Sequence, residues 1–392
     1  MFRREAKGEG GAKEQELQLE TVLVMQGGGS LGAYECGVYK TLEKHDIKFD
    51  IIAGTSIGAI NAAIITGAKQ NRDPANELED FWLNLAETIM PPLPIPFALP
   101  TGSLLVVDRI RAILSSMFSA TWGNPNAFFP IWFFSPPILD YFSYKLPYPL
   151  FDMTPLKNTL NDYVDFTQLK NPDRPRLIVT STDIQTSKPI IFDSKHLDID
   201  ADHIIAGAGF PFYGLAWTQK NNRYLWDGCL LSNTPLRDII DSSPIIDKKA
   251  YLVNVFPHYQ KELPRDMLQA WHRARDIIYC DKTDNNIRMS KIISRHLSLL
   301  KDMHDVISTN VKMDNKDHNK NEKLKERLRK IDHEYNKLAR QRGAIIQETI
   351  CIERTEESHF LFEDTDFSAD TIKRLLGQGE KDAEISLTQQ KN

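Results

Sequence analysis

Cysteine is scarce in this chain, and its four cysteines stand far apart, at positions 36, 229, 280 and 351 of 392. Without a CxxC pair or a dense set of cysteines, the sequence argues against a zinc site and against a disulfide scaffold, and reduced thiols are expected. An excess of positive charge is also missing, because the formal net charge is −5. We therefore expect no nucleic-acid partner.

The sequence also lacks a recognisable export signal and an unbroken membrane-spanning run. Arg3 and Arg4 are not followed by an apolar stretch, and residues 1–20 are predicted to form a disordered tail. Residues 112–139 carry no charge, but four prolines interrupt them, which is incompatible with one lipid-facing helix. We expect a cytoplasmic protein with peripheral membrane contact, while export by a route without a cleaved signal stays open.

Residues 91–151 form a proline-broken insertion that is rich in aromatic residues. Such rings suit a membrane–water interface or the wall of an acyl-chain pocket. The alternative is a buried insertion that covers the edge of a sheet, and both interpretations stay open. In either case the insertion lies between the two motifs interpreted below as nucleophile and base, where a lid over a lipid site is expected.

Two strand–glycine turn–helix units follow one another in residues 21–63. Their apolar runs, Val22–Met25 and Phe49–Ala53, each end in glycines, and helical periodicity follows over Ala33–Leu42 and again from Ala59. This order predicts parallel strands with crossover helices. Since 41% of the residues are hydrophobic, the chain can bury a substantial α/β core, in one large or two modest domains.

The second turn reads Gly54-Thr55-Ser56-Ile57-Gly58, which is the nucleophile-elbow pattern. A serine at its centre sits on a strained strand-to-helix turn with its hydroxyl exposed. The flanking glycines are needed because helix and strand approach closely there. The start of the following helix favours the negative charge that develops during acyl transfer. Ser56 is therefore a candidate nucleophile.

The first turn contains Gly27-x-Gly29-x-x-Gly32, formally the dinucleotide-binding fingerprint. Asp50 lies at about the right distance to bind a ribose, but it precedes the second strand instead of ending it. We prefer the alternative, in which the backbone N–H groups of the three consecutive glycines form an oxyanion hole beside Ser56. A third possibility is that both turns carry no chemistry.

A serine hydroxyl needs a base within hydrogen-bond reach, and none of the histidines lies in a turn motif. Asp227, followed by Gly228 at the end of a predicted strand, is the better candidate, giving a Ser–Asp dyad. A carboxylate is normally a weak base, so a partly apolar setting must raise its pKa. Trp226 and residues 210–213 could supply that setting.

Together these motifs resemble the patatin-like phospholipases in order and spacing over residues 21–256, on the residues Gly27-Gly28-Gly29-Ser30-Leu31-Gly32, Gly54-Thr55-Ser56-Ile57-Gly58 and Asp227-Gly228. The resemblance implies a three-layer α/β/α sandwich with a mainly parallel sheet and a serine lipid acyl hydrolase without a metal or organic cofactor. By position, Ser56 is the expected nucleophile and Asp227 the base. Gly27, Gly28 and Gly29 are the expected oxyanion hole, with Gly32, Gly54, Gly58 and Gly228 supporting the motifs.

Two positions depart from the family's pattern. Leu31 stands where the family usually has Arg or Lys, which puts the handling of an anionic head group in doubt more than hydrolysis. Cys229 follows Asp227-Gly228 where Gly or Ala is usual. Cysteine is small enough to pack there, and we do not expect it to act as a second nucleophile.

The C-terminal region resembles one bacterial subgroup of the family, through Arg275-Asp276-Ile277 and residues 362–368. We expect a catalytic domain over 21–260 and a mainly helical region over 261–392. Residues 265–313 and 314–343 are predicted to form a helical hairpin docked on the catalytic domain, with its basic face in solvent. Attraction of that face to an anionic bilayer is the alternative. A strand over Thr349–Glu353 and a final helix at Ala369–Leu376 are expected after it.

The sequence thus predicts a phospholipase A-type lipid acyl hydrolase that works through an acyl-enzyme. Two alternatives stay open: an esterase or thioesterase for soluble acyl groups, and a catalytically silent membrane-binding module. The expected partner is a lipid or phospholipid substrate, and no protein partner can be named.

Overall fold

A computed structural model describes residues 19–87, 119, 121–131, 148–242, 244–310, 318–341, 343–355 and 363–389. In this part of the chain, eight strands form one mixed sheet in the order β10-β9-β1-β2-β5-β8-β7, with β6 also paired to β5. The pairs from β10 to β5 are parallel, and those of β5 with β6 and β8 and of β8 with β7 are antiparallel. The sheet is mainly parallel, as the sequence predicts.

The strands of this sheet are β1 Glu20–Met25, β2 Ile51–Thr55, β5 Arg176–Asp183, β6 Lys188–Asp193, β7 Thr218–Lys220, β8 Arg223–Asp227, β9 Lys248–Asn254 and β10 Ile346–Glu353. A separate two-stranded ribbon pairs β3 Phe129–Pro130 with β4 Phe151–Asp152. The α-helices are α1 Gly32–Lys44, α2 Ile57–Thr66, α3 Pro74–Glu87, α5 Thr154–Tyr163, α6 Ala201–Ala206, α7 Leu236–Ile240, α8 Met267–Tyr279, α9 Asp284–Asn310, α10 His318–Gln341 and α11 Ala369–Gln389.

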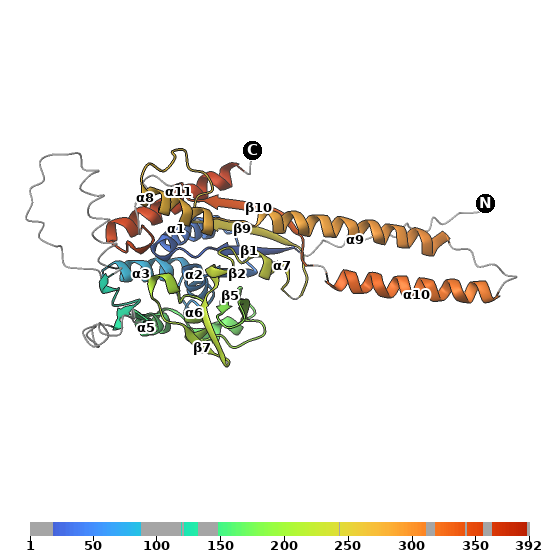
Figure 1. The fold of residues 1–392 in the computed structure, drawn as a ribbon, viewed down its shortest axis with the longest axis horizontal. Helices are drawn as coiled ribbons and strands as arrows, with labels where there is room; N and C mark the ends of the chain where they lie inside the picture. The colour runs from blue at the N-terminus through green and yellow to red at the C-terminus, as the bar shows by residue number, and fades with distance from the viewer. Residues whose placement is uncertain are drawn as a thin grey trace, which may run out of the picture.

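Helices cover both faces of the sheet, because alternate residues of its central strands point to opposite sides. On β1, Leu23 and Met25 join a large core that includes buried side chains of α1, α2, α3 and α11. Val22 and Val24 join a smaller core on the other face, where α7 and the base of α9 pack. Figure 1 shows these layers, and the expected α/β/α sandwich is confirmed.

The C-terminal region is partly built into this sandwich. β10 adds a parallel strand to β9 at the sheet edge, which confirms the strand expected at 349–353 and starts it three residues earlier. The helix α11, longer than expected, packs along α1; Tyr34 donates a hydrogen bond to Asp382, and Lys40 forms an ion pair with Glu380 at 2.9 Å.

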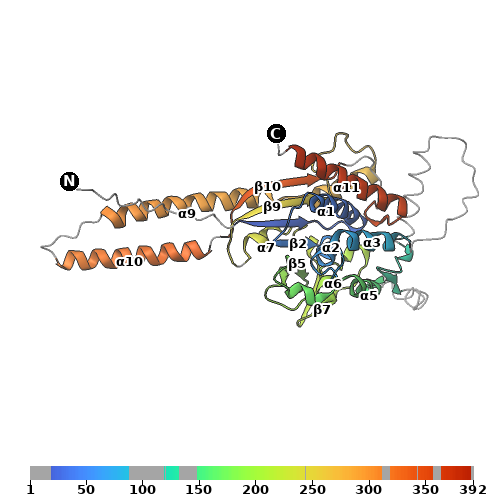
Figure 2. The same cartoon turned by 180° about the vertical axis from the view of Figure 1, so that it is seen from behind.

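The helices α9 and α10 form the expected hairpin, but it is not docked on the body. Figures 1 and 2 show both helices projecting away from the sheet, with only their bases near it. The expectation of a docked hairpin is therefore wrong. The hairpin projects because the recorded contacts of α9 with the body lie in its first turns: Ile287 packs on the smaller core, and Ser290 donates to the Ala344 carbonyl.

Some expectations fall on residues that the structure does not describe. Residues 1–18 of the expected tail lie outside the described part, and so does most of the 91–151 insertion, apart from 119, 121–131 and 148–151. Within the described residues, every helix is too short or too polar to cross a bilayer.

Candidate active site

Ser56 is the single residue between β2 and α2, and its backbone is strained. Its φ of 54° and ψ of −124° lie where residues other than glycine are rare. The side chain is half-buried at the carboxyl end of β2, next to the start of α2. The elbow geometry expected from the sequence is thus present at Ser56.

The flanking glycines are required by close approach of the backbone. A Cβ on Gly54 would lie 2.2 Å from the carbonyl of Gly58, and a Cβ on Gly58 would lie 2.6 Å from the carbonyl oxygens of Met25 and Gln26. The elbow therefore packs directly on the end of β1. This contact brings the two glycine-containing turns together.

The first turn lies against Ser56. A Cβ on Gly27 would meet the Ser56 Cβ at 2.8 Å, and Gly29 has a positive φ of 57°. Asp50, the acid that a dinucleotide site needs, accepts the N–H of Thr21 at the opposite, amino end of β1. It cannot reach a ligand at the glycine turn, which removes the dinucleotide interpretation.

The three glycines are not equivalent donors. The Gly27 N–H is donated to Asn233 Oδ1 at 3.0 Å, so it is already engaged. The N–H groups of Gly28 and Gly29 make no hydrogen bond with the described residues, and both glycines are half-exposed. Among the three predicted donors, Gly28 and Gly29 are therefore the ones open to a reacting oxygen.

Asp227 ends β8 and is completely buried. The register of the sheet brings it toward Ser56: Asp227 is opposite Ser181 of β5, whose neighbour Thr180 pairs with Thr55 of β2. Asp227 Oδ1 accepts the Cys229 N–H at 2.9 Å. Its other oxygen, Oδ2, is buried and completes no hydrogen bond with the described residues.

Burial raises the pKa of Asp227 to about 6, while the Ser56 hydroxyl and the Cys229 N–H act in the opposite direction. The shift agrees with the requirement for a stronger carboxylate base. Phe210 lies beside the site, since the Asp227 N–H is donated to Gly209. Trp226 does not supply the apolar setting expected for Asp227. Neighbouring residues of a strand face opposite sides, and the Trp226 indole N–H donates a hydrogen bond to the Tyr148 hydroxyl.

The two departures from the family pattern have structural explanations. Leu31 is fully buried in the large core, so this position does not face a substrate. Burial and the neighbouring Asp227 raise the pKa of the Cys229 thiol well above its ordinary value. A neutral thiol is a poor nucleophile, in line with the expectation for Cys229.

Asn233 is a residue whose contribution the sequence analysis missed. Its side chain accepts the Gly27 N–H and donates to the carbonyl oxygens of Gly27 at 3.1 Å and Tyr279 at 2.9 Å. Gln26 makes a second link, donating to Thr234 Oγ1 and accepting the Val255 N–H. The one sequence signal was the polar stretch Ser232-Asn233-Thr234, which begins four residues after Gly228.

The glycine turn is also covered by the segment Glu363–Asp366. A Cβ on Gly29 would lie 2.1 Å from the Asp364 carbonyl oxygen, so the two backbones are in contact. Ser30 Oγ donates to the Glu363 carbonyl at 2.9 Å. Residues more than 330 positions apart thus form one unit around the candidate oxyanion hole.

Buried charges hold this segment in place. Arg354 donates to both carboxylate oxygens of Glu363, at 2.9 and 3.3 Å, and both side chains are 1% exposed. Arg275 donates to Asp364 at 2.9 Å, and Tyr213 donates to the other oxygen of Asp364. Burial alone would raise the pKa of Glu363, but Arg354 and its cationic neighbours hold it well below the ordinary value.

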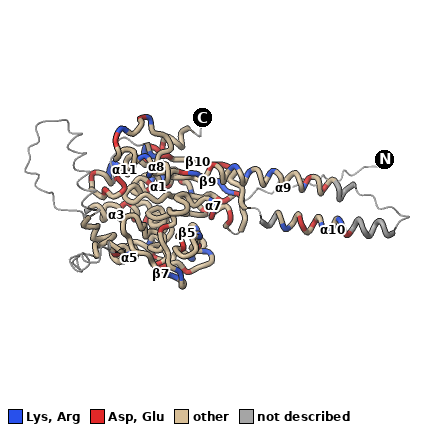
Figure 3. The backbone as a smooth tube through the Cα atoms, viewed as in Figure 1, with Lys and Arg blue, Asp and Glu red and all other residues tan. Residues whose placement is uncertain are grey.

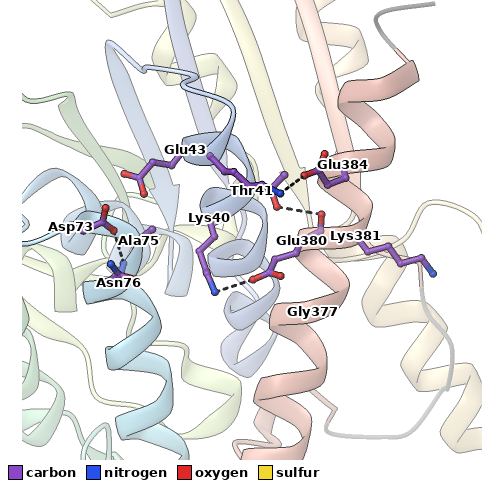
Figure 4. Close-up of a pocket in the computed structure, with 11 residues that line it drawn as sticks. Lys40, Thr41, Glu43, Asp73, Ala75, Asn76, Gly377, Glu380, Lys381 and Glu384 are labelled. Carbon is purple, nitrogen blue, oxygen red and sulfur yellow. Dashed lines mark hydrogen bonds and ion pairs between the residues drawn. The ribbon is translucent and has the colours of Figure 1, made fainter.

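A groove of about 740 Å³ lies away from these residues, between α1, α3 and α11 (Figure 4). Lys40 in this groove is paired with Glu79 and Glu380, and Lys44 with Glu384. The groove lies at the carboxyl-terminal end of α1, whereas the glycine turn precedes its first residue. It is therefore not the place where a substrate would meet Ser56.

Comparison with known proteins adds one family match: residues 23–240 fit the model of the family described as patatin-like phospholipase. The chain is 24% identical over 265 residues to a cGAMP-activated phospholipase of Escherichia coli (strain TW11681), covering 60% of this chain and 61% of that protein. It is 47% identical over 45 residues to the triacylglycerol lipase SDP1L of Arabidopsis thaliana, and this match covers 12% of this chain and 6% of the plant protein. This chain thus spans about three fifths of the bacterial relative and a small part of the plant one.

Among solved structures, the crystal structure of VipD from Legionella pneumophila aligns with a TM-score of 0.37 and 13% sequence identity, covering 95% of this chain and 67% of that one. A likeness at this level carries no argument about activity.

Proposed function

The chain belongs to the patatin-like phospholipase family, since that family's model matches residues 23–240, and on this premise we propose that it is a serine lipid acyl hydrolase with a Ser56–Asp227 dyad. The observation that carries the proposal is the pairing of a strained elbow serine with a buried carboxylate. Asp227 Oδ2 is buried and has no hydrogen-bond partner among the described residues, and burial raises the pKa of the Asp227 carboxyl group to about 6.

In the proposed reaction, Ser56 Oγ attacks the carbonyl carbon of an ester while Asp227 takes the hydroxyl proton. The N–H groups of Gly28 and Gly29 stabilise the negative oxygen of the tetrahedral intermediate. When the intermediate collapses, the leaving alcohol receives the proton from Asp227 and the acyl group stays on Ser56. Water then attacks the acyl-enzyme, Asp227 takes its proton, and the fatty acid leaves as Ser56 regains its hydrogen.

A phospholipid or another lipid ester is the proposed substrate, with peripheral contact to the lipid surface. Phe212 is 76% exposed and Leu231 is 47% exposed. Both lie next to the candidate base: the ring of Phe212 contacts Phe210, and Leu231 follows the turn that Asp227 caps. Exposed apolar side chains at the rim of a site favour a lipid surface over a small soluble ester.

Fluorophosphonate labelling tests the dyad directly. We expect a single adduct on Ser56, located by peptide mapping and absent from Ser56→Ala. Ser187→Ala is a matched control, because Ser187 is an exposed serine that also has a positive φ, 53°, but lies in a turn remote in sequence from either motif. No adduct on the folded chain, with phospholipid vesicles present, would favour the catalytically silent membrane-binding module instead.

A further inference from the structure

The helix α9 carries two stripes of side chains on nearly opposite sides. The inner stripe consists of Ile287, Ser290, Ser294, Leu297 and His304. Ile287 packs on the smaller core, Ser290 Oγ donates to the Ala344 carbonyl at 2.6 Å, and Leu297 is 8% exposed. Farther out, His304 contacts α10 through an ion pair with Asp332 and a stacked ring contact with Tyr335. The inner stripe therefore faces the body and α10.

The outer stripe consists of Met289, Ile292, His296, Leu299, Met303 and Val306, at alternating spacings of three and four residues. Every member except Met303 follows an inner-stripe residue by two positions, about 200° around a helix, and Met303 continues the same spacing. The apolar members remain open to solvent: Met289 is 53% exposed, Ile292 38%, Leu299 58%, Met303 53% and Val306 61%. The outer stripe is thus an apolar face that neither the body nor α10 covers.

A repeat of alternating three and four residues is the seam of a coiled coil, which needs a second helix of matching period. We propose that the outer stripe is an interface with a second copy of this chain, in which two α9 helices pack antiparallel. Figures 1 and 2 show the hairpin projecting away from the body, so a second hairpin can lie along it. Interfaces of this two-fold kind use the same patch on both copies.

The charges beside the outer stripe support a second copy as the occupant. Arg295 and Asp302 lie on the same flank of the stripe, seven residues apart, on either side of its midpoint. An antiparallel pair brings Arg295 of one copy near Asp302 of the other, twice by symmetry. Both side chains are exposed, and neither forms an ion pair within the described residues. The same helix does not suit an anionic bilayer, because Asp302 and Asp305 adjoin Met303 and Val306.

Both signs of charge also alternate along the hairpin, as Figure 3 shows. On the part of α10 whose side chains are described, Arg327, Arg329, Lys330 and Lys337 stand among Glu326, Asp332 and Glu334. This mixed pattern differs from a uniformly basic face that would bind an anionic membrane, which was the alternative left open by the sequence.

Sedimentation and light scattering of the full chain test the interface. We expect a dimer of about 90 kDa, twice the 44.9 kDa of one chain. Leu299→Glu/Met303→Glu should give a monomer with unchanged circular dichroism. Leu263→Glu is the matched control, since Leu263 is 84% exposed but lies outside α9, and it should remain a dimer.

Charge reversal tests the antiparallel arrangement. Arg295→Asp and Asp302→Arg should each weaken the dimer at least tenfold at low salt, and the double variant should restore it, because the ion pair is re-formed with its signs exchanged. A monomeric wild type, or a double variant weaker than either single one, overturns the proposal. So does binding of the wild type to anionic vesicles as a monomer with loss of that binding in Leu299→Glu/Met303→Glu.

Discussion

At the scale of single residues, Asp227 serves two opposing requirements. Burial raises the pKa of Asp227 from the ordinary 3.8 to about 6, which favours the proposed role as a base but makes the ionised group costly to bury. Between pH 4 and 6 the unfolded chain releases this proton before the folded chain does, so stability falls as the pH rises. A shift of about two pKa units corresponds to ~3 kcal/mol of unfolding free energy lost above pH 6.

Asp227→Asn should therefore abolish hydrolysis and yet stabilise the protein above pH 6. The amide can still accept the Cys229 N–H, so the local fold is kept. For the wild type, kcat/KM should rise with pH through a midpoint near 6, where the base becomes ionised. Urea unfolding of both proteins between pH 4 and 8 measures the stability difference. Substantial activity in Asp227→Asn, or equal pH dependence of stability in the two proteins, would contradict this account.

Substitution of Phe212 and Leu231 distinguishes a substrate in a lipid surface from a soluble ester. Phe212→Ser/Leu231→Ser should lower hydrolysis of phospholipid vesicles at least tenfold and leave a short water-soluble ester nearly unaffected. Tyr259→Ser is the control, because Tyr259 is 78% exposed but lies beyond β9. Equal losses on both substrates would favour the soluble esterase or thioesterase alternative.

At the scale of elements, the segment Glu363–Asp366 connects the C-terminal region to the glycine turn through buried charges. Arg354→Met leaves Glu363 without its bidentate partner, at a cost of about 3–5 kcal/mol. Arg354→Met/Glu363→Gln removes both charges and should recover most of that loss. Arg237→Met provides the control, because the Arg237–Asp241 pair is exposed and should change stability by less than about 1 kcal/mol.

The same variants distinguish two roles of Glu363–Asp366: positioning the glycine turn and stabilising the whole fold. If Glu363–Asp366 positions Gly28 and Gly29, Arg354→Met should lower kcat with little change in KM at temperatures where the variant is folded. An unchanged kcat in the folded variant would mean that the segment stabilises the fold without positioning the turn.

Local patterns predicted the elbow, the strand ending at Asp227 and the helices, because glycines and apolar periodicity act over a few residues. They could not predict that Asn233 occupies the Gly27 N–H, since the two residues are 206 positions apart and Asn in a polar loop is ordinary turn chemistry. The contact of Gly29 with Asp364 could not be predicted either, because these two residues are also far apart in the sequence. Periodicity predicted the hairpin, but not whether it packs on the body.

At the scale of the whole molecule, the hairpin and the hydrolase should be separable. Replacing residues 299–337 by a short Gly-Ser linker keeps the contacts of Ile287 and Ser290 with the body. The shortened chain should fold, hydrolyse a soluble ester at the wild-type rate and sediment as a monomer. A matched variant with the linker inserted between Met313 and Asp314, without deletion, should remain a dimer. Loss of activity in a folded monomer would show that the hairpin contributes to the site.

The position of β10 at the edge of the sheet has a consequence for biosynthesis. Because a ribosome makes the chain from its amino end, Ser56 and Asp227 emerge well before β10 and Glu363–Asp366. Until those segments follow, β9 is an open strand edge and Gly29 lacks its contact with Asp364. The nascent chain thus contains both members of the proposed dyad before the turn beside them has its contact with Asp364, and we expect the oxyanion hole proposed at Gly28 and Gly29 to be the last part of the site to form.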